Sequence, residues 1–204
     1  MTDEKRPYRM KRRAELEAET RLRITESAVA LHGTLGPART SISAIAEHAG
    51  VRRSTVYRHF PDEAALFAAC SSHWRAANPR PDVARWRAIE GPDERLRAAL
   101  SELYAYYRRT EGMLANLLRD EATVSTVQMS FSAFHGFLAD AAGVLMHGRR
   151  LRGGAAKRVR AAIGHALSFG TWQSLAREQG LDDRQAAGLM CRLVAAADES
   201  LALS

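Results

Sequence analysis

The chain has 204 residues, 46% of them hydrophobic, and 30 Lys and Arg against 23 Asp and Glu give it a net charge of +7. This length and composition allow a sizeable buried core without disulfides or metals. The two cysteines, Cys70 and Cys191, form no metal-ligand spacing and no disulfide framework, so we expect no metal, no cofactor and a reduced, cytoplasmic setting. No run approaches the roughly 20 apolar residues that cross a bilayer, so a soluble protein is expected.

The positive charge is concentrated in the first third of the chain. Residues 1–60 contain 12 Lys and Arg against 7 Asp and Glu, whereas the remaining residues contain 18 against 16. A local basic excess suggests a polyanionic partner, usually nucleic acid. A solvated basic face explains the same excess, so both interpretations stay open at this point.

Apolar residues recur at intervals near 3.6 along almost the whole chain, which predicts an all-α fold. The expected helices span residues 15–35, 43–49, 53–60, 61–78, 93–110, 113–121, 124–147, 155–179 and 182–203. Pro and Gly interrupt the pattern between residues 78 and 92, which favours a domain boundary there. We therefore predict a basic N-terminal arm at 1–14, a first domain at 15–78 and a second domain at 79–204.

Residues 40–60 form the most informative stretch of the sequence. They contain two short predicted helices joined by a turn at Gly50, with apolar residues facing inward: Ile42, Ile45, Ala46, Val51, Val56 and Phe60. Polar residues make the outward face of the second helix: Arg52, Arg53, Ser54, Tyr57 and Arg58. This is the sequence pattern of a helix-turn-helix, whose second helix enters the major groove of DNA. Arginine can pair with guanine edges there, and tyrosine and histidine can donate to phosphates.

This stretch resembles the DNA-binding domain of the tetracycline-repressor (TetR) family. The family's pattern of Gly and Thr, then Ile-Ala, Ala-Gly-Val and Tyr-x-His-Phe, occurs at Gly36, Thr40, Ile45-Ala46, Ala49-Gly50-Val51 and Tyr57-Arg58-His59-Phe60. The likeness covers about residues 18–68. It implies an N-terminal three-helix helix-turn-helix domain followed by a C-terminal helical ligand-binding and dimerisation domain. It also implies a non-enzymatic repressor that binds a palindromic operator as a homodimer and is released by a small molecule.

The resemblance assigns DNA contacts to ten residues: Thr40, Ser41, Ser43, Arg52, Arg53, Ser54, Thr55, Tyr57, Arg58 and His59. The residues before and at the start of the first motif helix would hold phosphate or face DNA, and those of the second would contact bases and backbone. One position departs from the family: Glu63 stands where a phosphate-binding Lys is usual. The basic arm could compensate through phosphate or minor-groove contacts, and a disordered, solvated tail is the alternative.

Two apolar stripes near the C-terminus are candidates for the dimer surface. One comprises Met190, Leu193, Val194, Ala197 and Leu201, and the other Val159, Ile163, Ala166, Leu167 and Gly170. Two such helices from each chain would form a four-helix bundle. Packing of both stripes inside the monomer is the alternative.

The middle helices are rich in large side chains that could line an effector pocket, since cavities between bundle helices are common ligand sites. The candidate ligand-binding residues are Tyr104, Tyr107, Leu117, Met129, Phe131, Phe134, His135, Leu138 and Trp172. They favour an apolar or aromatic effector. For each of them an ordinary core position is the competing interpretation.

An enzyme is the alternative from a different class. The sequence contains no dinucleotide-binding or phosphate-binding glycine loop, no His-Glu-x-x-His and no Gly-x-Ser-x-Gly motif. A nearer alternative is an activator or a DNA-binding regulator without an effector.

Overall fold

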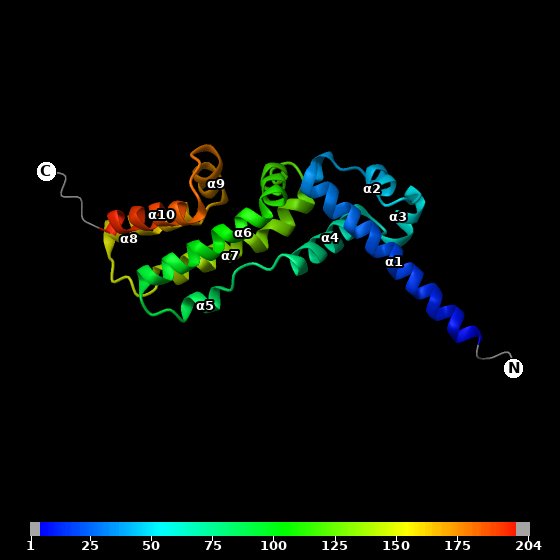
Figure 1. The fold of residues 1–204 in the computed structure, drawn as a ribbon, viewed down its shortest axis with the longest axis horizontal. Coiled ribbons are helices and arrows are strands. Elements are labelled where there is room, and N and C mark those ends of the chain that lie inside the picture. Colours follow the sequence, from blue (N-terminus) through cyan, green and yellow to red (C-terminus); the bar gives the residue numbers. More distant parts are fainter. Residues whose placement is uncertain (1–4, 199–204) are drawn as a thin grey trace. The chain divides into compact units, whose positions relative to one another are not determined.

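The structure is a computed structural model that describes the backbone of residues 5–198 and the side chains of residues 8–198. The described part is all-helical, as expected, with ten α-helices and two short helical turns. In chain order (Figure 1) they are α1 (Lys5–Thr34), η1 (Pro37–Arg39), α2 (Ile42–His48), α3 (Arg53–His59), α4 (Glu63–Ala77), α5 (Val83–Arg87), α6 (Pro92–Asp120), α7 (Ser125–Met146), α8 (Gly153–Leu167), α9 (Phe169–Gln173), η2 (Ser174–Glu178) and α10 (Asp183–Asp198).

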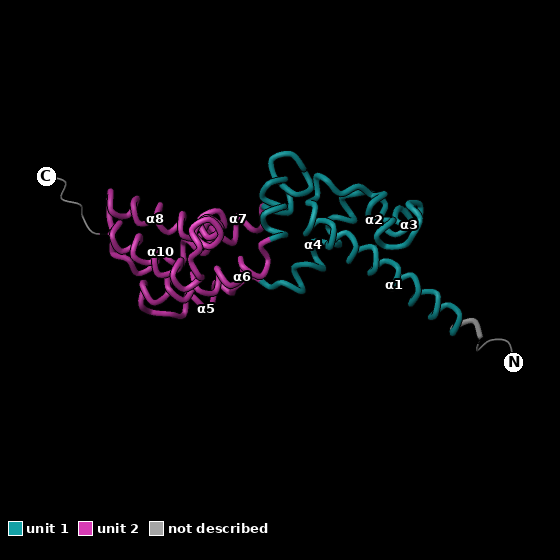
Figure 2. Tube along the Cα trace, turned by 45° about the horizontal axis from the view of Figure 1, so that its top comes forward, with its two compact units in different colours: residues 1–79, 112–131 teal, residues 80–111, 132–204 magenta. Residues whose placement is uncertain are grey.

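The chain forms two compact units, which Figure 2 shows in different colours. The first contains residues 1–79 and 112–131, and the second contains residues 80–111 and 132–204. Helices α6 and α7 therefore each contribute residues to both units. The segment 112–131 groups with the first unit in space. The three domain ranges predicted from the sequence stay a prediction.

The core of the first unit joins α1 to the three short helices that follow it. Ile24 and Ala28 of α1 are fully buried, and they pack in one cluster with Ile45 of α2, Val56 of α3 and Leu66 of α4. The apolar stripes predicted for these helices are thus the faces that hold α2 and α3 in place. Because those faces point inward, the opposite faces of α2 and α3 are left to solvent.

The long helix α6 departs from the expectation of two helices over 93–110 and 113–121. Gly112 lies inside α6 rather than at a break, and a Cβ added there would lie 3.3 Å from the carbonyl oxygen of Gly33. The glycine allows the end of α1 to approach closely. Asn116, one turn further along, donates from Nδ2 to the carbonyls of His32 (3.0 Å) and Gly33 (2.9 Å). These bonds satisfy carbonyls that the end of α1 would otherwise leave unpaired.

The second unit is built on aromatic and small side chains. Trp86 of α5 is fully buried, and its Nε1 donates to Glu102 at 3.0 Å. Helices α8 and α10 pack against each other through buried residues that include Ile163 and Val194. The helix expected over 155–179 is three elements instead, since α8 ends at Leu167 and α9 and the π-helical turn η2 follow.

Among the described residues, α7 is the one helix that is long and apolar enough to cross a membrane, with a mean hydropathy of 1.2. A core helix of a soluble protein can have the same length and composition. Val127 and Leu145 of α7 are fully buried, and 28% of the apolar window is buried in all. A single helix of this length and composition is weak evidence for a membrane segment.

Candidate nucleic-acid interface

Helices α2 and α3 form the helix-turn-helix that the sequence predicts. Ser41 begins α2, because its Oγ accepts from the backbone N–H of Ala44 at 3.1 Å. Gly50, with φ of 64°, makes the turn, and the N–H of Val51 then donates back to the carbonyl of Ala46 at 2.9 Å. The turn sets the angle at which α3 leaves α2.

The outward face of α3 is polar, basic and open. The side chains of Arg52, Arg53, Ser54, Tyr57 and Arg58 are all exposed. Nη2 of Arg53 donates to the hydroxyl of Tyr57 at 3.2 Å, and its guanidinium lies 5.6 Å from the centre of that ring. This contact orders a long side chain on the exposed face, which lowers the entropy that Arg53 would lose on binding a ligand.

The two hydroxyls before α2 differ in what they can offer a phosphate. The hydroxyl of Thr40 donates to the carbonyl of Gly36 at 2.8 Å, so its proton is already used. Ser41 Oγ accepts from a backbone N–H, so its own proton is available to a phosphate oxygen. Ser41, together with the exposed Ser43, is therefore better placed than Thr40 to donate to DNA.

The end of α3 rests on a residue of α1 that the sequence analysis did not single out. The guanidinium of Arg21 donates to the carbonyl of His59 and lies 4.0 Å from the centre of the Phe60 ring. The available signal was spacing, since Arg21 precedes the core residue Ile24 by three positions and so shares its face of the helix. Arg21 fixes α1 against the C-terminal end of α3.

One ring nitrogen of His59 makes no hydrogen bond within the described part of the chain. Its Nε2 is buried and has no hydrogen-bond partner among the described residues. Burial lowers the pKa of His59, and the positive charges of Arg58 and Arg21 lower it further. The ring is therefore mostly neutral at pH 7, and an arriving phosphate would favour its protonation.

The start of α4 is acidic. Asp62 caps the helix by accepting from the backbone N–H of Ala65 at 2.7 Å, and the exposed Glu63 follows it. Glu63 and Thr40 line the same small cavity of about 70 Å³. A phosphate held near Thr40 would thus meet a carboxylate, where the family usually supplies a lysine.

Three of the nine predicted ligand-binding residues lie together in the second unit. The ring of Tyr107 lies near those of Tyr104 and Trp172, whose centres are 6.3 and 5.9 Å from its own. The hydroxyls of Tyr104 and Tyr107 donate to the carbonyls of Ala166 (2.9 Å) and Leu167 (2.6 Å). Burial raises the pKa of both tyrosines. Their polar atoms are satisfied within the chain, as in an ordinary core.

The other six candidates are divided between the units. Leu117, Met129 and Phe131 belong to the first unit, whereas Phe134, His135 and Leu138 belong to the second. Met129 is 67% exposed and His135 is also exposed, so neither is enclosed by the described part of the chain. Leu117 packs against the core of the first unit.

Most residues of the two predicted dimer stripes are buried within the second unit. Val159, Ile163 and Val194 are fully buried, and Ala166, Leu167 and Met190 are also buried, whereas Leu193 and Gly170 are exposed. The six buried residues therefore pack inside the second unit, and a second chain does not cover them. An amphipathic stripe identifies a buried face but not the element that covers it. Leu201 lies outside the described residues.

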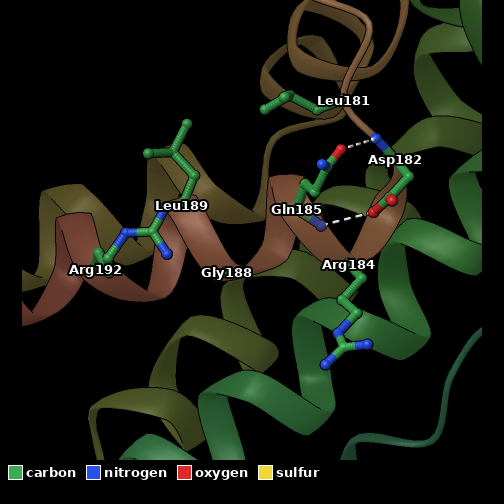
Figure 3. A pocket seen from close by; sticks show the side chains of 7 residues that line it. All are labelled: Leu181, Asp182, Arg184, Gln185, Gly188, Leu189 and Arg192. Carbon is green, nitrogen blue, oxygen red and sulfur yellow. Dashed lines mark hydrogen bonds between the residues drawn. The ribbon is translucent and has the colours of Figure 1, made fainter.

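One side of α10, which includes Leu193 of the predicted stripe, is open to solvent. Leu193 is 41% exposed, and Leu181, Gly188, Leu189 and Arg192 help to line an open surface groove (Figure 3). The figure also shows how the helix begins: Asp182 and Gln185 exchange hydrogen bonds with each other's backbone N–H at 2.8 and 3.0 Å.

Comparison with known proteins agrees with this geometry. Residues 24–70 match the family model described as bacterial regulatory proteins, tetR family. No curated protein matches the chain in sequence.

Solved structures share the fold at low identity. A TetR-like transcriptional regulator from Rhodococcus sp. RHA1 is 18% identical, with a TM-score of 0.60 over 86% of this chain and 93% of that one. FadR from Bacillus subtilis, solved with stearoyl-CoA, is 16% identical, with a TM-score of 0.58 over 88% and 98%. The repressor FadR from Thermus thermophilus, solved with lauroyl-CoA, is 22% identical, with a TM-score of 0.52 over 90% and 99%.

Proposed function

We propose that the chain is a tetR-family transcriptional regulator, a repressor that binds a palindromic operator as a homodimer and is released by a small molecule. The family consists of regulatory proteins rather than enzymes. The observation that supports the proposal most is the exposed basic face of α3, held outward by the buried Val56 and Phe60.

We assign base contacts to the exposed residues at the start of α3. Arg53 and Ser54 lie in its first turn and Arg52 is its N-cap residue, and this is the part of a recognition helix that reaches base edges. Tyr57 and His59, near the other end, would bind the DNA backbone. Ser41 would add a phosphate contact from the start of α2.

Two copies are needed because one helix of seven residues covers only a few base pairs. We propose that the exposed face of α10, around Leu189 and Leu193, meets its counterpart in a second chain. The exposed Gly164 of α8 would allow close approach of backbones in the same interface. A two-fold pair of this kind matches a palindromic operator with half-sites about 34–36 Å apart.

An apolar or aromatic effector is supported by the aromatic content of the second unit. Tyr104, Tyr107 and Trp172 form a satisfied cluster, so an effector would have to open it or bind beside it. Two structural neighbours were solved with acyl-CoA molecules, which makes long acyl chains sensible test compounds. Effector binding can favour release only if the released form binds the compound more tightly. A regulator of this kind acts in the cytoplasm, where the DNA is.

The test of DNA binding is fluorescence anisotropy with a labelled duplex from the protein's own promoter, against a scrambled duplex of equal length. Wild-type protein should prefer the promoter duplex, with affinity that falls as salt rises. Arg53→Gln should lose about 1–3 kcal/mol of binding and relax the sequence preference. Arg87→Gln, an exposed arginine of α5, is the matched control and should bind like wild type. Equal binding of both duplexes by the wild type would reject the proposal.

The effector is tested separately. Stearoyl-CoA, lauroyl-CoA and a set of small aromatic compounds are added to the protein and to the protein–DNA complex. A true effector raises the melting temperature of the free protein and releases the labelled duplex over the same concentration range. A compound that stabilises the complex instead would make the ligand a co-repressor or co-activator.

A further inference from the structure

Helix α1 begins many residues before its first residue in the core of the first unit. Every described side chain from Tyr8 to Glu19 is exposed, and the first fully buried residue of the helix is Ile24. At 1.5 Å per residue, the turns from residue 5 to residue 19 extend about 22 Å beyond the packed part of the helix. Figure 1 shows this part of α1 continuing past α2 and α3.

The exposed turns are strongly basic at their outer end. Residues 5–13 contain six Lys and Arg and no Asp or Glu. Four of these residues, Arg9, Lys11, Arg12 and Arg13, have described side chains. From here on, "the basic arm" means these four residues of the predicted N-terminal arm. Arg9, Arg12 and Arg13 are three and four positions apart, so they share one face of the helix and repel one another.

The basic arm opposes the stability of its own helix. The first turns of a helix favour acidic side chains, and the first turn of α1 has none. Arg13 pairs with Glu17 at 3.2 Å, but both side chains are more than half exposed, and such a pair adds well under about 1 kcal/mol. A local arrangement that costs stability without a gain inside the chain is typical of a functional site.

The arm leaves the core at the end of α3. Arg21 contacts the carbonyl of His59 and the ring of Phe60, so α1 passes directly beside the last turn of α3. The basic arm follows two to three helical turns further out on the same continuous helix. A duplex that covers the exposed arginines of α3 and continues past the end of that helix would bring phosphates toward this part of α1.

We propose that the basic arm is a second DNA-contact element, which binds phosphates beside the base pairs that α3 recognises. This inference rests on the function proposed above. DNA is favoured over an anionic membrane because one duplex can neutralise both the arm and Arg52, Arg53 and Arg58 of α3. The arm adds affinity without sequence preference, because phosphates are the same at every base pair.

The expected signature is electrostatic. Each phosphate contact contributes about 0.9 to the slope of log K against log salt concentration. Two contacts by the arm of one protomer therefore make the slope steeper by about 1.8. Their loss would reduce the fall in affinity between 50 and 200 mM salt by about tenfold.

The experiment compares two full-length variants with the same change in charge. The arm variant replaces Arg9, Lys11, Arg12 and Arg13 by Gln, and the control variant replaces Arg150, Arg152, Lys157 and Arg160, which are exposed basic residues of the second unit. Salt slopes are measured on a duplex selected from random DNA by the wild type and on a random-sequence duplex of equal length. Binding to phosphatidylserine-containing vesicles is measured in parallel.

The proposal predicts a salt slope reduced by about 1.8 or more on both duplexes for the arm variant, an unchanged sequence preference, and a wild-type slope for the control. Equal slopes for the arm variant and the wild type would overturn it, as would an equal loss in the control. Loss of vesicle binding without any change on DNA would also overturn it and assign the arm to a membrane. If wild-type protein selects no DNA sequence, the proposed function itself fails.

Discussion

Gly36 lies in the turn between α1 and α2, which side chains at the end of α6 contact through hydrogen bonds. Its φ of 91° and ψ of 157° belong to a backbone region that is almost restricted to glycine. A Cβ at this position would lie 2.0 Å from Nη2 of Arg119 and 2.6 Å from Oδ2 of Asp120. The same Oδ2 accepts from the N–H of Ala38 at 3.0 Å, and Nη2 of Arg119 donates to the carbonyl of Leu35 at 2.9 Å. Gly36→Ala must therefore strain the backbone and displace both side chains.

The expected cost has two parts. The backbone conformation costs a non-glycine residue about 1–3 kcal/mol. Displacing Asp120, which is 3% exposed, removes a hydrogen bond from Ala38 in a nearly buried place and costs about 1–2 kcal/mol more. The sum, about 2–5 kcal/mol, is a large share of the roughly 5–15 kcal/mol that stabilises a typical domain.

Urea denaturation followed by circular dichroism measures this loss at pH 7. The control is Gly136→Ala in α7, where a new Cβ meets nothing within 4 Å and φ is not positive. Alanine favours a helix by up to about 1 kcal/mol over glycine, so the control should be slightly stabilised. A loss below about 0.5 kcal/mol for Gly36→Ala would refute the assigned strain and the contacts of Arg119 and Asp120.

Three further substitutions test other parts of the structure. Burial, against the attraction of the Asp120 carboxylate, lowers the pKa of His32 to about 4, so the folded chain binds fewer protons than the unfolded chain below pH 6.5. The contribution of His32 to the free energy of unfolding is therefore complete above pH 6.5 and declines as the pH falls toward 4. The loss is about 2 kcal/mol between pH 7 and 4.5. Urea melts of His32→Leu should lack this pH-dependent loss. Glu63→Lys should tighten DNA binding and steepen its salt slope by about 0.9, and weaker binding would contradict a phosphate near this position. Tyr104→Phe leaves the Ala166 carbonyl unpaired and should cost about 1–2 kcal/mol in denaturant melts, so an unchanged midpoint would disprove that buried bond.

The helix-turn-helix could be predicted from the sequence because its determinants are local. Ile45, Val56 and Phe60 are buried as their spacing indicates, and Gly50 makes the turn with a positive φ. The polar residues between them are exposed for the same reason. A pattern of this kind, with a period and a turn residue, needs no knowledge of distant parts of the chain.

Features that depend on tertiary contacts were not predictable in the same way. Gly112 suggests a break by composition, but in space it makes room for Gly33 and the helix continues. The stripes of α8 and α10 were apparent, yet nothing in the pattern says that Ile163 and Val194 are buried within the chain rather than against a second chain. Arg21 was overlooked because its partner, the His59 carbonyl, is 38 residues away.

Selection of bound duplexes from a random-sequence pool tests the central claim most directly, because it asks whether the exposed face of α3 recognises DNA. The account predicts an enriched inverted repeat whose two halves lie about one helical turn apart, with base preferences that change when Arg53 is replaced by Gln. A pool that shows no enrichment, or an enriched sequence that the Arg53 substitution leaves unchanged, would contradict it.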